Sequence, residues 1–459
     1  MEQKRPTARD VAVRALRDRA GNVSASLDRL VKEASLEVSD RRLARELAMG
    51  AVRRHGTLRA IIRAFLTQPG KKLPVPLEEI LHVALYQVIF LERIPAFAAV
   101  NEAVGQAIRF GHKRQSGLIN GLLRGVARSI SSRISGRCPA SPEAVPVSPD
   151  SHRLLGRAVF DRPEDSPSGY LSGAYSLPED LAERWLSARG SLAGASDLAI
   201  HSCTRPPMIL RVNRLAASVD QAIASLASDG MTARPHANGL SVVLDGPVEL
   251  KKLAAFADGW LQVQDPTATS VSTAARPKAG MKVLDFCAAP GTKTTHIAEL
   301  MDNRGQIVAV DVSQQKLDRI SENCKRMGAG IVTVMPAERI GGLAPGSFDL
   351  ALVDAPCSNT GVLARRPEAK WRFAPKALAR LADDQLFLVA AAAGLVRRGG
   401  KLVYSTCSIE PEECSRLAAS AVRRCGSLDM IEENLTLPSG ASDPLRWCDG
   451  GYCTVFAVR

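Results

Sequence analysis

The sequence predicts a multidomain protein with an all-α bundle at the N-terminus, a small α/β connecting domain, and a C-terminal α/β domain with a mostly parallel, doubly wound sheet. Three observations support this fold class. The chain has 459 residues, more than one hydrophobic core accommodates. Its first third carries apolar residues at helical spacing, and its last third alternates strand and helix patterns. The predicted boundaries are 1–130, 131–174, 175–265 and 266–459.

Residues 1–130 have the pattern of an almost continuous series of helices. Apolar residues recur at spacings of three and four within 11–16 and 43–52, and Asp40 is the expected N-cap of the second of these helices. Residues 80–91 are so apolar that they should form the central buried helix. The bundle is completed by two further helices, at 97–110 and 115–129.

The periodicity is lost over residues 131–174, where serine, proline and glycine dominate. Such a composition buries too little apolar surface to offset the entropy of ordering, so we expect a partly disordered linker. A small mixed region follows from residue 175. Its expected elements are strands at 209–212, 242–244 and 260–265 and a helix at 216–228.

Strand and helix patterns alternate from residue 281 onward, which is typical of a doubly wound sheet. The expected strands are 281–286, 306–311, 330–334, 348–353, 400–404 and 452–458. In such sheets ligands bind at the carboxyl ends of the strands, near the point where the strand order reverses. Residues that directly follow these strands are therefore the candidates for chemistry.

The composition, 46% hydrophobic and 23% charged, is that of a soluble globular protein. No run of about 18 apolar residues occurs, so we expect no membrane-spanning helix. The first residues lack the apolar core of a secretion signal. Ten cysteines are scattered without a CxxC pair, which favours a reduced cytoplasmic chain without structural zinc or any other metal site.

The net charge of +13 is concentrated in the N-terminal part of the chain. Residues 1–137 hold 25 Lys/Arg and 12 Asp/Glu, so the remainder is neutral. A basic domain of this kind suits a polyanionic partner such as RNA, because binding releases the counterions of the phosphates. A solvated basic face explains the same excess equally well.

The segment 285–294, with the sequence DFCAAPGTKT, closes the first strand and opens a helix. Small residues let a ligand approach the backbone, and the start of a helix offers unpaired N–H groups. The segment matches neither GxGxxG nor the phosphate-binding loop. A strand–helix turn that merely requires small residues is the alternative. Asp311 ends the next strand, where a carboxylate suits ribose hydroxyls; a helix N-cap, with Ser313 competing for the position, is the alternative there.

Two cysteines follow two later strands. Cys357 lies in Asp354-Ala355-Pro356-Cys357-Ser358, and Cys407 lies in Ser405-Thr406-Cys407-Ser408. A single buried cysteine is usually an inert apolar residue. Two of them at equivalent strand ends, beside an acid and a nucleoside site, indicate nucleophilic chemistry.

Together these motifs resemble the bacterial small-subunit ribosomal RNA cytosine-5 methyltransferases of the RsmB/Sun (Fmu) type. The DFCAAPGTKT segment is similar to the family's first S-adenosylmethionine motif, and DAPCS and STCS are similar to its two cysteine motifs. Segments 40–46, 85–87 and 118–124 resemble the NusB-type RNA-binding domain. Segment 205–214 and Gln264-Asp265 resemble the family's connecting domain.

The resemblance implies a covalent mechanism on cytosine. Cys407 would add to C6, Asp354 would contact the base near N3, and Cys357 would assist release of the product. The implied contacts of S-adenosyl-L-methionine are Cys287, Ala288, Ala289, Pro290, Gly291, Thr292, Lys293, Asp311 and Asp354. The implied partner is RNA, 16S ribosomal RNA in particular, and the implied state is a monomer. Arg365, Arg366, Lys370 and Trp371 form either an RNA-binding rim or the start of a surface helix.

Three positions depart from the family pattern. Thr292 replaces a second glycine, Cys414 stands where an asparagine is common, and Ala337 stands where an aspartate contacts the adenine end of the cofactor. That contact is either lost or made by Glu338, one residue later. The departures bear on cofactor affinity rather than on methyl transfer.

Other functions stay open at this stage. The same chemistry could act on transfer RNA or another RNA. A catalytically weakened cofactor-binding RNA assembly factor is a second alternative, although Cys407, Cys357 and Asp354 are all present. A small-molecule methyltransferase would not require the basic helical domain.

Overall fold

The computed structural model describes residues 5–17, 23–68, 70, 72–246 and 248–459. The chain forms two compact units. The first unit comprises Met1–Thr204 together with Arg366–Arg372, and the second comprises Arg205–Arg365 and Phe373–Arg459. Within the described residues, no helix combines the length and the apolar character that a bilayer crossing requires.

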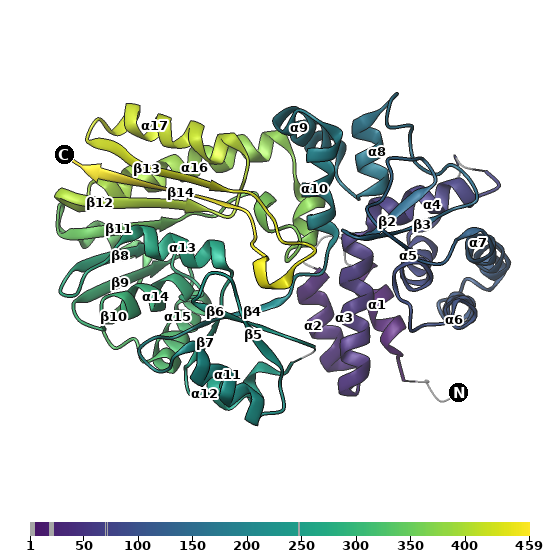
Figure 1. Cartoon of the computed structure of the whole chain (residues 1–459), viewed down its shortest axis with the longest axis horizontal. Coiled ribbons are helices and arrows are strands. Elements are labelled where there is room, and N and C mark those ends of the chain that lie inside the picture. Colours follow the sequence, from purple (N-terminus) through teal and green to yellow (C-terminus); the bar gives the residue numbers. More distant parts are fainter. Residues whose placement is uncertain (1–4, 18–22, 69, 71, 247) are drawn as a thin grey trace. The chain divides into compact units, whose positions relative to one another are not determined.

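The first unit begins with the predicted helical bundle (Figure 1). Its helices are α1 (Ala8–Arg17), α2 (Val23–Glu33), α3 (Val38–Arg53), α4 (His55–Phe65), α5 (Val75–Phe90), α6 (Ala96–Arg109) and α7 (Ser116–Ser129). As expected, α5 is the central helix, with twelve of its sixteen residues buried. The prediction for Asp40 is wrong, because α3 starts at Val38 and Asp40 lies within its first turn. There its carboxylate still faces the positive end of the helix dipole.

Residues 131–174 are folded, so the prediction of a partly disordered linker is wrong. They form a three-stranded antiparallel sheet, in the order β1-β3-β2, and a helix. The bounds are β1 (Ile134–Ser135), β2 (Ala144–Ser148), β3 (Ser151–Leu154) and α8 (Pro167–Ala174). Arg54 of the bundle donates to the carbonyls of Pro146 and Val147 at 2.9 and 2.8 Å. The segment is ordered because it shares the core of its neighbours, which a composition argument does not consider.

Helices α9 (Glu179–Arg189) and α10 (Leu192–Cys203) complete the first unit together with the short 3-10 segment Pro367–Arg372. Contacts therefore place residues 175–204 with the bundle rather than with the connecting sheet. The remaining domain boundaries stay predictions.

The second unit contains two sheets. The smaller one has the order β5-β6-β4-β7, with all neighbouring strands antiparallel. Its elements are β4 (Met208–Val212), α11 (Val219–Ser228), β5 (Ala233–Pro235), β6 (Ser241–Leu244), α12 (Ala254–Ala257) and β7 (Leu261–Val263). This β-α-β-β-α-β arrangement confirms the three predicted strands and the helix; β5 was not predicted. A capping box between Ser218 and Gln221 starts α11.

The larger sheet has seven strands in the order β10-β9-β8-β11-β12-β14-β13. They are β8 (Lys282–Phe286), β9 (Gln306–Asp311), β10 (Val332–Pro336), β11 (Phe348–Asp354), β12 (Val396–Thr406), β13 (Leu428–Thr436) and β14 (Gly451–Val458). The five strands from β10 to β12 are parallel, and β14 runs antiparallel to both of its neighbours. All six predicted strands are present. The seventh, β13, escaped prediction because most of its residues are exposed at the sheet edge, so it lacks an alternating buried pattern.

Helices cover both faces of the larger sheet (Figure 1). One face packs against α16 (Pro375–Ala393) and α17 (Ser415–Cys425), and the other packs against α13 (Pro266–Ala275), α14 (Thr292–Leu300) and α15 (Gln314–Met327). The chain leaves β8 toward β9 and β10 and then returns to β11 on the other side. The strand order therefore reverses between β8 and β11, where the ligand site of such a sheet is expected.

Candidate active site

The two predicted cysteines meet at the carboxyl edge of the larger sheet. Cys357 follows β11 and Cys407 follows β12, and these strands are parallel neighbours that pair Asp354 with Ser405. The two sulfur atoms lie 3.1 Å apart, and the Cys407 thiol also lies 3.4 Å from Oδ1 of Asn359. The hydrogen bond to Cys407 is the main cause that raises the pKa of Cys357 well above its ordinary value, and burial adds to it. Cys357 is therefore the protonated member of the pair at neutral pH.

An ion pair between Lys293 and Asp354 lines the same cavity as Cys407. Nζ of Lys293 is 2.6 Å from Oδ2 of Asp354, and the hydroxyl of Ser405 donates to Oδ1 of Asp354 at 2.8 Å. Burial alone would lower the pKa of Lys293, but the Asp354 carboxylate outweighs it and the pKa is raised. The cavity measures about 60 Å³ and its lining includes Lys293, Asp354 and Cys407. A charged amine, a carboxylate and a thiol thus face one space.

The loop after β8 has the backbone that its small residues suggested. Cys287 and Gly291 both adopt positive φ angles, 63° and 91°, and α14 begins at Thr292. A Cβ atom on Gly291 would lie 3.4 Å from the backbone of Ile320, so the loop packs closely on α15. Burial raises the pKa of Asp285 to about 7. Its Oδ2 accepts from the Thr294 hydroxyl at 2.5 Å, and its Oδ1 is buried without a partner among the described residues.

Asp311 holds this loop in place. Its Oδ2 accepts from the backbone N–H of Ala289 at 3.0 Å, and its Oδ1 accepts from the N–H of Val312 and from Nζ of Lys316, at 2.7 and 2.9 Å. Asp311 does not cap α15, which follows Ser313 without a side-chain cap. The carboxylate lies at the predicted strand end, directly beside the loop backbone.

The site fits a cationic nucleoside such as S-adenosyl-L-methionine. Burial and, after it, the carboxylates of Asp311, Asp354 and Asp285 raise the pKa of Cys287 to about 12, so the loop lies in a negative potential. The sulfonium and amino groups of the cofactor are both positive, and the orphan Oδ1 of Asp285 is an unused acceptor. Two of the departures from the family pattern leave this charge arrangement intact. Ala337 packs against the core beside an exposed Glu338, and Cys414 is a buried thiol that contacts the carbonyl of Ser408.

Glu413 supports the loop of Cys357, although the sequence did not identify it. It is completely buried. Its carboxylate accepts from the N–H and the hydroxyl of Ser358, at 2.9 and 2.5 Å, and from Nε2 of Gln385 at 2.9 Å. Gln385 also donates to the carbonyl of Pro356 at 2.8 Å. The Pro-Glu-Glu run after the second cysteine motif was the available signal for this residue.

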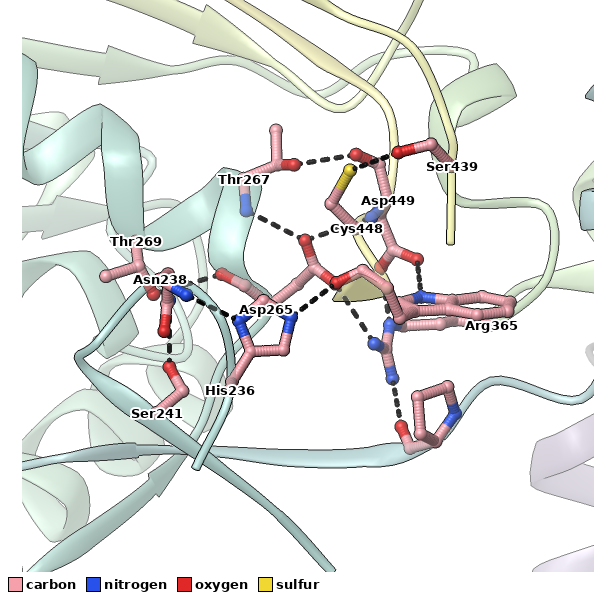
Figure 2. Close-up of polar contacts among 12 residues, drawn as sticks. His236, Asn238, Ser241, Asp265, Thr267, Thr269, Arg365, Ser439, Cys448 and Asp449 are labelled. Carbon is pink, nitrogen blue, oxygen red and sulfur yellow. Dashed lines mark hydrogen bonds and ion pairs between the residues drawn. The ribbon is translucent and has the colours of Figure 1, made fainter. Parts of the chain in front are cut away.

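A second support is an ionic cluster, the Arg365 clamp, in which the half-buried Arg365 meets the buried carboxylates of Asp265 and Asp449 (Figure 2). The guanidinium donates to Oδ2 of Asp265 at 3.0 Å and also to Asp449, while its remaining amine reaches the carbonyl of Pro207. Asp265 accepts in addition from the backbone N–H groups of Thr267 and Asp449. Asp265 and Asp449 line the cavity that contains Cys407.

The clamp connects to both cysteine loops through glycine backbone. Gly361 donates to the carbonyl of Cys407 at 3.0 Å, and Gly450, next to Asp449, donates to the carbonyl of Gly361 at 2.8 Å. A Cβ atom on Gly361 would lie 2.4 Å from the carbonyl oxygen of Gly450, so only glycine allows this approach. Backbone hydrogen bonds therefore connect three segments: the strand end of Cys407, the loop of Cys357 and residues 447–451.

The predicted RNA-binding rim is not formed. Arg365 belongs to the clamp, and Lys370 is completely buried within the first unit. Nε1 of Trp371 donates to the carbonyl of Val52 at 3.0 Å, and its ring meets His55 edge-on. Arg366 and Trp371 are exposed, but Trp371 is tied to the first unit by these contacts and the four residues do not form one rim. The alternative prediction, a plain surface helix, fails for Lys370 because that residue is buried.

All ten cysteines are free thiols. Cys203, Cys324, Cys414 and Cys453 are buried, as expected of packing residues. Among the residues that the structure describes, no three or more His, Cys, Asp or Glu side chains are grouped so that they could hold a metal ion.

Three family models match the chain. One described as 16S rRNA methyltransferase RsmB/F covers residues 272–442, one for the NusB family covers 6–128, and one for the ferredoxin-like domain of RsmF/B-like methyltransferases covers 177–251.

Solved structures share the fold. The crystal structure of PH0851 has a TM-score of 0.74 and 23% identity and covers 98% of both chains. A methyltransferase homolog protein from Pyrococcus horikoshii has a TM-score of 0.52 and 25% identity, over 62% of this chain and 96% of that one.

Curated relatives span nearly the whole chain. The probable ribosomal RNA small subunit methyltransferase B of Synechocystis sp. (strain ATCC 27184 / PCC 6803 / Kazusa) is 34% identical over 416 residues, 89% of this chain and 87% of the relative. The ribosomal RNA small subunit methyltransferase B of Escherichia coli (strain SMS-3-5 / SECEC) is 33% identical over 417 residues, 89% of this chain and 88% of the relative. The chain therefore belongs to the RsmB/F family of S-adenosylmethionine-dependent 16S rRNA methyltransferases.

Proposed function

We propose that the protein methylates C5 of a cytosine in small-subunit ribosomal RNA through a covalent adduct between Cys407 and C6 of the base. The observation that carries this proposal is the pair of thiols 3.1 Å apart at neighbouring strand ends, beside the Asp354–Lys293 ion pair. C5 of cytosine is a poor nucleophile. Addition of a thiolate at C6 turns the ring into an enamine with electron density at C5, which overcomes this difficulty.

The different surroundings of the two thiols support the assignment of their roles. Cys357 is the protonated member of the pair, so its S–H can donate to Cys407 and stabilise the thiolate that Cys407 forms when it attacks C6. Once the sulfur of Cys407 is bonded to C6, it is neutral and no longer holds the proton of Cys357. The largest cause of the raised pKa of Cys357 is then removed. Cys357 can then take part in removal of the C5 proton, after which the thiolate of Cys407 leaves.

Asp354 and Lys293 together match the polar edge of cytosine. The amino group at position 4 is a donor, which a carboxylate accepts, and N3 and O2 are acceptors, which an ammonium satisfies. A cation held at this edge stabilises the negative charge that develops on the ring during attack at C6. The contact of 2.6 Å with Asp354 raises the pKa of Lys293, so its ammonium stays charged at this partly buried position.

The cofactor supplies an electrophilic methyl group bound to a sulfonium. Residues 287–293 and Asp311 would hold it, with the orphan oxygen of Asp285 as a further acceptor. Lys293 was expected at the cofactor, yet its ammonium faces Asp354 and the cavity of Cys407. We therefore assign Lys293 to the base.

The substrate assignment is supported by the names of the relatives, which act on the small ribosomal subunit RNA, and by the basic first 137 residues. Bisulfite sequencing of 16S ribosomal RNA from cells with and without this gene tests it. We expect one cytosine to lose its protection from conversion when the gene is removed. Unchanged protection in 16S RNA together with a loss in transfer RNA would contradict the assignment.

The chemistry is tested by exchanging each cysteine. Cys407→Ala should abolish methylation and form no adduct, whereas Cys357→Ala should accumulate a protein–RNA complex that survives denaturing electrophoresis. Cofactor binding, measured by calorimetry without RNA, serves as the control that both variants fold. An adduct in Cys407→Ala and none in Cys357→Ala would reverse the two roles.

A further inference from the structure

The first unit contains a basic pocket that no predicted motif identified, the Phe65–Arg157 pocket. Its volume is about 470 Å³, within the range of small-ligand sites. It lies at the C-terminal end of α4, along one face of α7 and beside the residues that follow β3. The lining residues are Phe65, Leu66, Thr67, Gly121, Leu122, Gly125, Arg128, Ser129, Gly156 and Arg157.

Gly156 and Arg157, from the segment that composition predicts to be a linker, build one wall of this pocket. Leu155 pairs with Ile130 in an antiparallel bridge, and the N–H of Gly156 donates to the carbonyl of Ser129 at 2.9 Å. A Cβ atom on Gly156 would lie 3.6 Å from Ser129. These backbone contacts hold the next residue, Arg157, at the end of α7.

The guanidinium of Arg157 is oriented before any ligand binds. Its Nη1 donates to the carbonyl of Ala64 at 2.9 Å, and its central carbon lies 4.6 Å from the centroid of the Phe65 ring. Neither Arg157 nor Arg128 pairs with a carboxylate among the described residues, and no lining residue is acidic. The pocket therefore presents two uncompensated positive charges beside an aromatic ring.

The floor of the pocket is open because α7 has glycine on this face. A Cβ atom on Gly121 would meet nothing within 4 Å, and one on Gly125 would lie 3.4 Å from the Phe65 ring. Larger side chains at these positions would fill the space. Glycine in the middle of a helix costs about 1 kcal/mol relative to alanine, so an open face here has a stability cost.

We propose that the Phe65–Arg157 pocket binds a nucleotide of the substrate RNA other than the one that is methylated. The arginines would contact phosphate, and a base would stack on the aromatic ring or on the guanidinium plane, as in single-stranded RNA sites. The pocket shares no residue with the cavity of Cys407 and serves recognition, not chemistry. The proposal rests on the function in RNA methylation proposed above. It also provides the phosphate contacts that Arg365 and Lys370 do not make.

The test blocks the pocket without removing any existing contact. Gly121→Glu places a carboxylate in it, and Gly117→Glu is the matched control, because both glycines lie on α7 with open space and only Gly121 lines the pocket. Binding of the full-length protein to deproteinised 16S ribosomal RNA is measured by filter binding over a series of salt concentrations. We expect Gly121→Glu to weaken binding about tenfold beyond the control and to lower the salt slope by about one.

A second pair of variants removes a positive charge instead. Arg128→Ala should weaken RNA binding several-fold and reduce the salt slope, whereas Arg124→Ala, on the same helix but outside the pocket, should not. A short single-stranded oligouridylate should compete with 16S RNA for binding to the unmodified protein. It should compete less well for binding to Gly121→Glu. Equal effects of pocket and control variants, or competition only by an RNA duplex, would overturn the proposal.

These binding measurements need no methyl transfer and no cytosine. If the cysteine variants contradict the adduct mechanism while Gly121→Glu still weakens RNA binding, the pocket stands and the chemistry is wrong. If 16S RNA binding is insensitive to all four pocket and control variants while methylation proceeds normally, the pocket proposal alone is wrong.

Discussion

Lys293 and Lys370 are two lysines withdrawn from solvent in different units of the molecule, and their partners give them opposite properties. Lys293 is 2.6 Å from the carboxylate of Asp354, which raises its pKa despite burial. Lys370 is completely buried, 3.4 Å from the thiol of Cys203, and burial lowers its pKa to about 8, with Arg54 and Arg53 nearby. The same side chain thus has its pKa raised at the catalytic edge and lowered in the helical unit.

Their consequences differ as well. The charge of Lys293 is stabilised where a substrate base would use it, whereas Lys370 contacts only protein, through Cys203 and the carbonyl of Arg53 at 3.5 Å. Burial of a titratable group therefore marks a functional site only when its partner keeps the group in the form that the chemistry needs.

The largest effect is expected on kcat, which should fall when Lys293 is replaced but not when Lys370 is replaced. Lys293→Met should lower kcat by about 10²–10³-fold, since it removes the cation beside the base. Lys370→Met should leave kcat within a few-fold of the unmodified protein, because Lys370 contacts no part of the cavity. Steady-state kinetics with 16S RNA measures both. A rise in the KM for the cofactor alone, with kcat unchanged in Lys293→Met, would instead place this lysine at the cofactor.

The lowered pKa of Lys370 should also make the free energy of unfolding depend on pH. The pKa of Lys370 is about 8 in the folded protein and 10.5 when exposed, so between these pH values the unfolded chain binds more protons. The free energy of unfolding should therefore rise from pH 8 to pH 10.5, by up to about 3 kcal/mol. Lys370 also lowers the pKa of the buried Cys203 thiol, which adds a change of the same sign.

Urea unfolding of the protein and of Lys370→Met over this pH range measures the effect. The difference between the two should vanish as the pH approaches the upper limit. Parallel pH profiles for the two proteins would show that Lys370 keeps its ordinary proton affinity.

The Arg365 clamp gives a smaller effect at the catalytic edge. Arg365→Lys keeps the charge, but an ammonium cannot bridge two carboxylates and a carbonyl in one plane. We expect a loss of about 2 kcal/mol in the free energy of unfolding and a kcat reduced about tenfold, with cofactor affinity unchanged. Arg397→Lys, which alters an exposed pair with Asp349, is the control and should change stability by less than about 1 kcal/mol. Equal losses in the two variants would mean that the clamp has no special role.

The smallest effect concerns Trp371. Trp371→Phe removes the hydrogen bond to Val52 and keeps the aromatic contact with His55, so the free energy of unfolding should fall by about 1 kcal/mol. RNA affinity should not change, since Phe keeps the exposed aromatic face of Trp371 and only the hydrogen bond to Val52 is lost. A several-fold loss of RNA affinity without a loss of stability would restore Trp371 as an RNA-binding residue.

Much of the catalytic edge could be predicted because its features are contiguous in the chain. The loop 287–293, Asp311, Cys357 and Cys407 each follow directly on a buried strand, and parallel strands bring their carboxyl ends to one edge. The same reasoning assigned Lys293 to the cofactor, and that assignment stays a prediction. The sequence motif does not show that the Lys293 ammonium contacts Asp354, 61 residues later.

Features without apolar periodicity were predicted poorly. The edge strand β13 exposes most of its side chains, and residues 131–174 are held by Arg54 and Ile130 rather than by a core of their own. The Phe65–Arg157 pocket could not be predicted for the same reason, because one of its walls lies in the segment that composition assigned to a linker.

The order of the elements, the nucleoside loop and the two cysteines were determined by short stretches of chain, since strand, turn and helix propensities act over a few residues. The roles of the basic residues were decided by folding. Arg365 meets Asp449 and Asp265, 84 and 100 residues away, and Lys370 meets Cys203, 167 residues away. Whether a charge faces RNA or the interior depends on which distant side chains pack around it, and the spacing of residues along the chain does not encode such partners.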